Sequence, residues 1–346
     1  MNPLIHSGRL NRTPSVPVQP DQAFTLTELL VVVGTLAVLA LLLVPALAGT
    51  KTDSWRIQCQ NNLKQLQVGF SQFAQDHNEM LPPAGYQASS GSSGVLTWDA
   101  YIHHYFGDTN SDSSWTQGVL WAGSSPTMET IELCPADRQP RVSWMYVNMD
   151  PTAPLQFAPR TYAMNSAGSA WSVDFQVDPQ NGKYPLPDLN QPNRHGVGIY
   201  WSSSASTPDW DAKGYKTSVV KDPGGTILLT EQASSMQLVG WIWPCVSVGP
   251  MTTDGRSGGW GSLYQIDTAA PTDAVTLTQN QNGYNEGQQL YQAHWNRFNY
   301  LFHDGHVEAL RIEDTVGTGP GNLNFKLANP KGMWTVAPGD SVAPGD

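Results

Sequence analysis

The chain has 346 residues, only 14% of them charged, and a formal net charge of −11. This length suffices for one large or two ordinary domains with a buried core. The 32 Gly, 26 Pro and 13 Trp favour short strands joined by many turns over a helical bundle. A negative chain lacks the clustered Lys and Arg that a phosphate backbone requires, so no nucleic-acid partner is expected.

The first strong feature is an uncharged run of twenty residues from Leu29 to Ala48. As a helix it spans about 30 Å, the thickness of a bilayer hydrocarbon core, and core helices are seldom apolar on every face for this long. A cleaved secretory signal is the main alternative, because Ala46-Leu47-Ala48 resembles its cleavage site. The run is longer than a usual signal core, and Glu28 precedes it where a signal would carry positive charge. A transmembrane helix over residues 24–48 is therefore expected.

The residues around Glu28 read Ala23-Phe24-Thr25-Leu26-Thr27-Glu28. They resemble the processing site of type IV prepilins, in which a membrane peptidase removes a leader before a Phe and the new amine is methylated. The resemblance implies a leader of residues 1–23 and a cut between Ala23 and Phe24. Most members of that family have Gly before the cut, whereas this chain has Ala. The resemblance also makes Glu28 the carboxylate that meets the terminal amine of a neighbouring subunit during assembly.

Beyond the apolar run the sequence becomes polar but keeps one apolar stripe with a spacing of three or four residues, which predicts an amphipathic helix over 49–80. Prolines 82 and 83 end it. The whole helix would be about 80 Å long, half in the membrane and half packed on a domain. The stripe consists of Trp55, Cys59, Leu63, Leu66, Phe70, Phe73 and His77.

Residues 81–327 form the expected extracytoplasmic, β-rich globular domain, followed by a loose tail over 328–346. Residues 226–230 predict a buried strand, and residues 298–312 a hairpin with Asp304-Gly305 as a two-residue type I′ turn. That register places on one face Phe298, Tyr300, Phe302, Val307 and Ala309. The predicted fold class is α+β: a long N-terminal helix on a predominantly antiparallel sheet, as in pilins.

The hairpin extends the resemblance. His294, nine residues, then Asp304-Gly305 match the His-x9-Asp-Gly motif of a large group of bacterial prepilin-type proteins. Segments 61–65, 133–137 and 161–165 and the strand ending at Glu231 also look like that group. No biochemical activity follows from this resemblance beyond the pilin-like anchor. A structural role for His294, Asp304 and Gly305 in fixing the hairpin is expected.

The three cysteines, Cys59, Cys134 and Cys245, contain no Cys-x-x-Cys pair, so a zinc ribbon is excluded. In an exported domain one disulfide plus one free thiol is possible. Cys59 lies on the apolar stripe of the helix. It is either a small buried hydrophobe or joined to the globular domain, with Cys134 as its possible partner.

Two groups of potential metal ligands occur, at His303-Asp304-Gly305-His306 and at His103-His104 with Asp108. Asp304 suits its turn for backbone reasons, so no metal ligand set is expected. By analogy with calcium-binding pseudopilins, calcium at Asp304 and Glu308 stays possible.

The chain contains no Gly-x-Ser-x-Gly, His-Glu-x-x-His or glycine-rich phosphate loop, so no enzymatic activity is expected. The favoured hypothesis is a pseudopilin-like structural subunit of a type II secretion or type IV pilus-like assembly. It would be a single-pass inner-membrane protein with a cytoplasmic N-terminus and a periplasmic or extracellular domain. Its partners would be the prepilin peptidase, other pilin-like subunits and inner-membrane assembly proteins. The alternative is a surface-anchored binding module, for example for carbohydrate, since Trp241, Trp243 or Trp295 could stack on sugars.

Overall fold

The computed structural model describes parts of the chain that together hold a long helix and most of a globular core. Contacts divide the chain into two compact units, Met1–Thr50 and Lys51–Asp346. Within the first helix, side chains are described up to residue 42 and again from residue 53. The described residues are 25–88, 95–116, 123–138, 157–165, 196–202, 206–232, 237–240, 246–247, 264–266, 275–277, 288–311, 313–315, 332–334 and 336.

Helix α1 runs from Leu26 to Asp76. It begins with a capping box: the amide and hydroxyl of Thr25 both donate to Glu28 Oε2, at 2.9 and 2.7 Å. The Glu28 amide in turn lies 3.3 Å from Thr25 Oγ1. Among the described residues, no helix is both long and apolar enough to cross a membrane.

The apolar stripe predicted for the second half of α1 is confirmed. Its five central side chains are at most 2% exposed: Cys59, Leu63, Leu66, Phe70 and Phe73. The flanking Trp55 and His77 are half-buried. The helix ends shortly before the proline pair, where Asn78 and Glu79 take left-handed backbone angles, φ 55° and 61°.

The remaining elements are short. The helices are α2 (Trp98–Ile102), α3 (Asp112–Trp115), α4 (Pro126–Glu132) and α5 (Gln288–Ala293), with 3₁₀ turns η2 (His103–Phe106), η6 (Thr217–Val219), η7 (Glu313–Thr315) and η8 (Gly332–Trp334). The strands are β1 (Gly85–Gln87), β2 (Val95–Thr97), β3 (Tyr162–Asn165), β4 (Tyr200–Ser202), β5 (Ile227–Glu231), β6 (Val246–Ser247), β7 (Tyr264–Ile266), β8 (Val275–Leu277), β9 (Phe298–Phe302) and β10 (Val307–Leu310).

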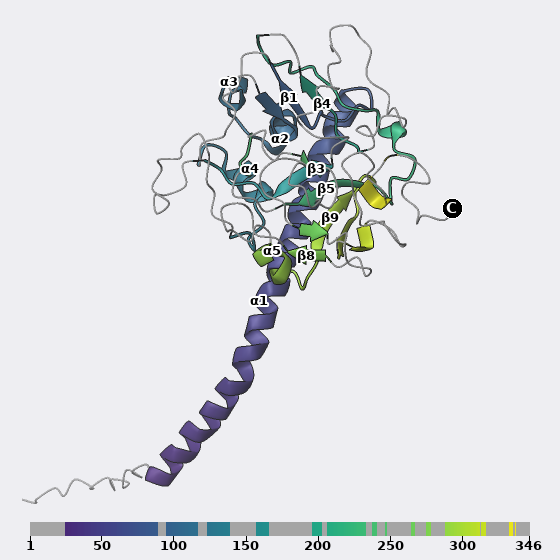
Figure 1. Cartoon of the computed structure of the whole chain (residues 1–346). Coiled ribbons are helices and arrows are strands. Elements are labelled where there is room, and N and C mark those ends of the chain that lie inside the picture. The colour runs from purple at the N-terminus through teal and green to yellow at the C-terminus, as the bar shows by residue number, and fades with distance from the viewer. Residues whose placement is uncertain are drawn as a thin grey trace, which may run out of the picture. The chain divides into compact units, whose positions relative to one another are not determined.

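A five-stranded sheet of order β10-β9-β5-β3-β6 forms the centre of the globular unit (Figure 1). Its pairings are antiparallel except for the parallel contact of β3 with β6. The predicted buried strand at 226–230 is confirmed as β5, every residue of which is buried. Strands β3 and β9 are also buried along their whole length, as expected when both faces of a sheet are covered.

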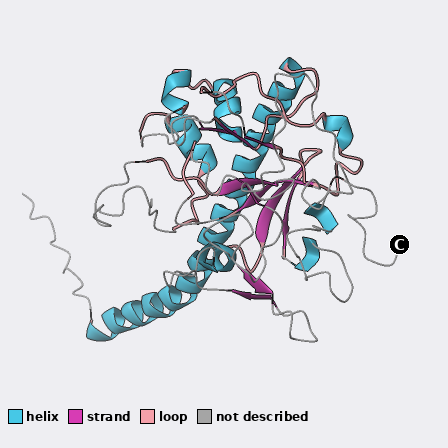
Figure 2. Cartoon of the chain, turned by 45° about the horizontal axis from the view of Figure 1, so that its top comes forward, coloured by secondary structure: helices cyan, strands magenta, loops and turns pink. Residues whose placement is uncertain are grey.

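Strand β9 shows what covers the two faces, since successive side chains point to opposite sides. Asn299 faces the second half of α1 and accepts a hydrogen bond from Gln60 at 3.0 Å. Tyr300 faces the other way and packs edge-on against Trp334 of η8, with ring centroids 6.0 Å apart. Figure 2 shows the strands of this sheet lying against the long helix.

The β9–β10 hairpin departs from the predicted register. Val307 pairs with Leu301, so the loop comprises residues 303–305 instead of a two-residue turn. Gly305, at φ +95°, supplies the left-handed residue that closes such a three-residue loop. A shift of one residue moves side chains to the other face. Val307 and Ala309 therefore do not share a face with the aromatic residues of β9, and that prediction is wrong.

Two smaller sheets and the C-terminal turn complete the described fold. The first sheet has the order β2-β1-β4, with β4 parallel to β1, and β7 and β8 form an antiparallel pair. Trp334 and Val336 are only 2% and 3% exposed, so the expected loose tail is wrong at these positions. The fold is a mixture of helices with mainly antiparallel sheets.

Candidate functional site

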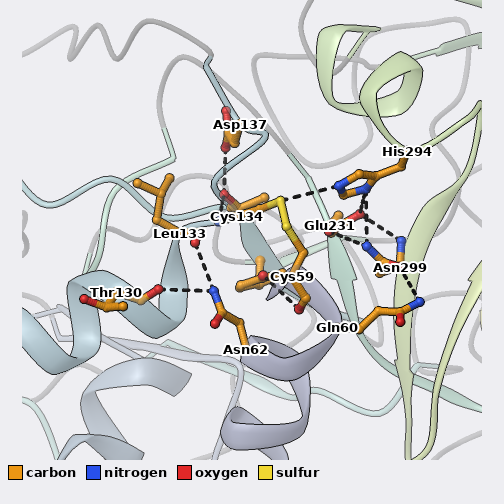
Figure 3. Close-up of a disulfide and its surroundings, with 12 residues drawn as sticks. Cys59, Gln60, Asn62, Thr130, Leu133, Cys134, Asp137, Glu231, His294 and Asn299 are labelled. Carbon is orange, nitrogen blue, oxygen red and sulfur yellow. Dashed lines mark hydrogen bonds and ion pairs between the residues drawn. A yellow bond between two sulfur atoms is a disulfide. The ribbon is translucent and has the colours of Figure 1, made fainter. Parts of the chain in front are cut away.

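A disulfide joins the buried face of α1 to the segment after α4 (Figure 3). It links Cys59 to Cys134, whose Cα atoms lie 4.9 Å apart, and neither residue is exposed. These are the two cysteines named from the sequence as a possible pair. Cys245 lies outside the described residues.

Beside the disulfide, a buried carboxylate at the end of β5 gathers three donors. Glu231 Oε2 accepts from the Asn299 amide at 2.8 Å and from His294 Nδ1 at 3.0 Å, and its Oε1 accepts from Asn299 Nδ2 at 2.9 Å. All three residues are at most 1% exposed. A buried carboxylate requires such donors, because unpaired it would lose its hydration without compensation.

His294 connects this carboxylate to the disulfide. Its Nδ1 faces Glu231 and therefore carries the proton, while its Nε2 lies 3.6 Å from Cys134 Sγ. The histidine is positioned by α5 and the turn after it, since its backbone amide bonds to the carbonyls of Leu290 and Tyr291. The imidazole thus lies between the strand carboxylate and the disulfide sulfur.

Helix α1 also contributes two polar side chains close to Cys59. Gln60 Nε2 donates to Asn299 Oδ1 at 3.0 Å. Asn62 Nδ2 donates to the carbonyls of Thr130 and Leu133, at 3.1 and 3.0 Å. Carbonyls near the C-terminal end of a helix lack intrahelical partners, so Asn62 satisfies groups at the end of α4.

The segment carrying Cys134 is also tied to strand β3. The Cys134 amide donates to Thr161 Oγ1 at 3.0 Å, and that hydroxyl donates to Asp137 Oδ2 at 2.7 Å. The backbone amide of Thr161 donates to the carbonyl of Glu132 at 2.8 Å. The scattered sequence motifs at 61–65, 133–137, 161–165, 231 and 294 therefore meet in one cluster.

The chemistry of this cluster depends on whether the two sulfur atoms are oxidised to a disulfide or reduced to thiols. Donor atoms of Cys59, Cys134, Glu231 and His294 lie within 4.8 Å of one another, a spacing that suits a metal ion. A thiolate, however, is the sulfur species that ligates metals, and the disulfide removes both thiolates. Every member of the cluster is buried, and the arrangement holds elements of the fold together.

A second buried polar cluster was not anticipated from the sequence. Arg160 Nη1 donates to Asp99 Oδ2 at 2.6 Å, and both side chains are fully buried. Gln237 Oε1 accepts from the same guanidinium at 3.0 and 3.1 Å, and the Gly240 amide donates to Asp99 Oδ2 at 2.8 Å. The signal for this cluster that the sequence offered was the presence of charged residues next to the motifs at 133–137 and 161–165.

Glu132 borders this second cluster. Neither of its carboxylate oxygens has a hydrogen-bond donor among the described residues, although the residue is fully buried. Burial, and then the charge of nearby Asp99, raise the pKa of Glu132 well above its usual range, while Arg160 opposes them. The shift favours the neutral, protonated form of the side chain.

The other predicted site residues lie apart from the disulfide. Asp304 sits in the hairpin loop, where its Oδ1 accepts from the His306 amide at 3.0 Å. A Cβ added at Gly305 would come within 3.2 Å of the Gln67 side chain, so the motif glycine also allows close approach to α1. Glu28 caps α1, an interaction that Thr25-x-x-Glu28 could have signalled. Ala23 and Phe24 lie outside the described residues.

A protein-family profile matches most of the chain. Residues 55–317 match the sequence profile of the family described as "Protein of unknown function (DUF1559)". No curated protein and no solved structure shows significant similarity to the chain. The matched segment covers more than half of the chain and includes every motif that meets at the disulfide, and the chain therefore belongs to the DUF1559 family.

Proposed function

We propose that the chain is a pseudopilin-like structural subunit of a type II secretion or type IV pilus-like assembly. The observation that carries the proposal is the prepilin-like sequence from Ala23 to Glu28, which lies at the start of the 51-residue helix α1. DUF1559 domains commonly occur in type IV pilin-like proteins, which supports the same reading.

In this proposal the first half of the helix, residues 24–48, anchors the chain in the inner membrane. The N-terminus is cytoplasmic, and the single membrane pass delivers the globular domain to the periplasm or beyond. The twenty uncharged residues from Leu29 to Ala48 support this assignment. The second half, 49–80, packs on the domain through its buried stripe. The partners are the prepilin peptidase, other pilin-like subunits and inner-membrane assembly proteins.

The motif cluster suits a structural role better than a catalytic one. The Cys59–Cys134 disulfide and the contacts of Gln60 and Asn62 bind the helix to two separate parts of the domain, the end of α4 and strand β9. A filament subunit carries its domain on such a helix, so the helix must not detach from the domain under load. Within the described residues, each motif side chain of the cluster is bonded to protein groups.

Glu28 has two candidate roles, and two substitutions distinguish them. The capping box needs only an acceptor at this position, which Gln provides as well as Glu. Pairing with the amine of a neighbour's Phe24 requires the negative charge. Glu28→Leu removes both functions, whereas Glu28→Gln removes only the charge. Co-purification of full-length variants with other pilin-like subunits, extracted from native membranes, is the assay.

We expect both variants to insert and to be cleaved before Phe24, with an N-methylated terminus in the mature chain, and both to lose the partner subunits. Normal assembly by Glu28→Gln would assign the residue to capping alone. A mature terminus near Gly49 in the wild type would mean an ordinary secretory protein and would overturn the proposal. Glycan binding without any partner subunit would favour the surface-anchored module, to which the 57% exposed Trp295 could contribute a stacking face.

A further inference from the structure

The segment from α2 to α3 carries a cluster that neither the disulfide nor the anchor explains. One donor atom each from His103, His104 and Asp112 lies within 4.8 Å of the others. His104 Nε2 is 3.2 Å from Asp112 Oδ1, and both side chains are more than half exposed. His103 is fully buried beneath them, and its ring centroid is 3.7 Å from that of His104.

One nitrogen of His103 is fixed by a carboxylate. Its Nδ1 lies 2.9 Å from Asp108 Oδ2, whose side chain is 3% exposed. Asp108 is held firmly, since Oδ2 also accepts from Trp115 Nε1 at 3.1 Å and Oδ1 accepts from the amide and side chain of Asn110 at 3.2 and 2.8 Å. A carboxylate in this position keeps the proton on Nδ1 and leaves Nε2 with a free lone pair.

That second nitrogen has no hydrogen-bond partner. His103 Nε2 is buried, and no donor contacts it among the described residues. Leaving a buried acceptor unsatisfied costs about 1–3 kcal/mol, so the orphaned lone pair requires an explanation. Metal-binding histidines show this arrangement, in which one ring nitrogen donates to a carboxylate and the other binds the ion.

We propose that His103 Nε2, His104 and Asp112 bind a divalent transition-metal ion of the Zn²⁺ class. Two imidazoles and one carboxylate are ligands that zinc accepts, whereas calcium and magnesium prefer oxygen ligands alone. The two exposed ligands give an ion access from solvent, and the buried His103 fixes its depth. Three protein ligands leave the fourth tetrahedral position open to water or to a group from another molecule.

The sequence-based view of this region is changed in two respects. From the sequence alone, no metal ligand is expected at His103-His104 with Asp108. The geometry assigns Asp108 to positioning His103, and it makes Asp112, the first residue of α3, the carboxylate ligand. The proposal stands independently of the pilin-like function.

The test uses the full-length protein in detergent, purified without a histidine tag and freed of metal. Zn²⁺ is titrated against a chromophoric chelator, and Co²⁺ serves as a spectroscopic probe of ligand geometry. We expect one equivalent of metal, a visible Co²⁺ spectrum of tetrahedral type, and no competition from millimolar Ca²⁺. His104→Ala and Asp112→Asn lie at the surface, so they should leave the fold intact and weaken binding at least tenfold.

Two further variants complete the design. Asp108→Asn removes only the carboxylate that positions His103 and should weaken binding about 10–100-fold. His306→Ala is the matched control, because His306 is another exposed histidine paired with an aspartate, Asp304. The control should bind metal as the wild type does. Absence of a bound equivalent in the wild type, or unchanged affinity in His104→Ala and Asp112→Asn, would overturn the proposal.

Discussion

Removal of the Cys59–Cys134 disulfide is the most direct test of how α1 is held to the domain. Replacing both cysteines with Ala removes the covalent link and introduces no new polar group. The residues are 75 positions apart in sequence. With 75 residues in the closed loop, the chain-entropy relation predicts a loss of about 4 kcal/mol at 25 °C.

The measurement is urea unfolding of the full-length protein in detergent, followed by tryptophan fluorescence. We expect the Cys59→Ala/Cys134→Ala variant to lose about 2–4 kcal/mol of unfolding free energy, which is the typical contribution of a disulfide. A reducing agent should destabilise the wild type by a similar amount and leave the double variant unchanged. Cys245→Ala is the matched control for loss of a sulfur, and it should respond to reductant as the wild type does.

Two results would refute this reasoning. The double variant could unfold within about 0.5 kcal/mol of the wild type, the range of ordinary surface substitutions. The wild type could also be insensitive to reductant under conditions that reduce the disulfide. Either result would mean that the non-covalent contacts of α1, its buried stripe and the hydrogen bonds of Gln60 and Asn62, hold the helix in place without the disulfide.

Two buried acids give further predictions. Glu231→Gln replaces an acceptor of three hydrogen bonds and should lower the free energy of unfolding in urea by about 3 kcal/mol. The exposed control Glu308→Gln should change it little. Equal effects of the two substitutions would contradict the role of the cluster. The raised pKa of Glu132 means that the folded chain keeps a proton which the unfolded chain loses above its ordinary pKa of 4.5. The contribution of Glu132 to stability should therefore fall as the pH rises above 4.5, and Glu132→Gln should remove this contribution to the pH dependence. An unchanged pH dependence would refute the assignment.

The helix could be predicted from sequence because its signal is local and repeated. The apolar residues between Cys59 and Phe73 recur every three or four positions and so lie on one face of the helix. Burial of this stripe can therefore be predicted from the spacing alone. Strand β5 could be predicted equally well from the sequence, since a short apolar run with β-branched residues is typical of a buried strand. Both elements carry their information within a few residues.

The hairpin register could not be predicted in this way. An Asp-Gly pair suits a two-residue turn, but it also suits a three-residue loop with Gly in the left-handed position. The structure adopts the second arrangement, in which the His303 amide donates to the Thr226 carbonyl and the Asp304 amide to the Pro223 carbonyl. The turn residues alone are compatible with either loop length. In the folded chain, the three-residue loop makes tertiary contacts with the segment before β5.

The candidate sites depended still more on tertiary structure. The motif resemblance identified His294 and the strand end at Glu231, but the meeting of these residues with Asn299 and the disulfide requires strands β5 and β9 and helices α1, α4 and α5 to be placed first. The Asp99–Arg160 pair has no sequence pattern of its own, since its members lie 61 residues apart. His103 and His104 are potential ligands in the sequence, but the buried Nε2 of His103 without a partner among the described residues, and the approach of Asp112, depend on the folded structure.

The proposed topology relates the disulfide to the membrane anchor. Disulfides form in the periplasm and outside the cell and are rare in the cytosol. On that topology Cys59 and Cys134 both lie beyond the membrane, so the covalent link between α1 and the domain can form only after the domain has been exported. Glu28, at the other end of the same helix, would act only when a subunit enters an assembly. The helix would then be fastened to its domain before it is recruited, which is the order that a load-bearing subunit requires.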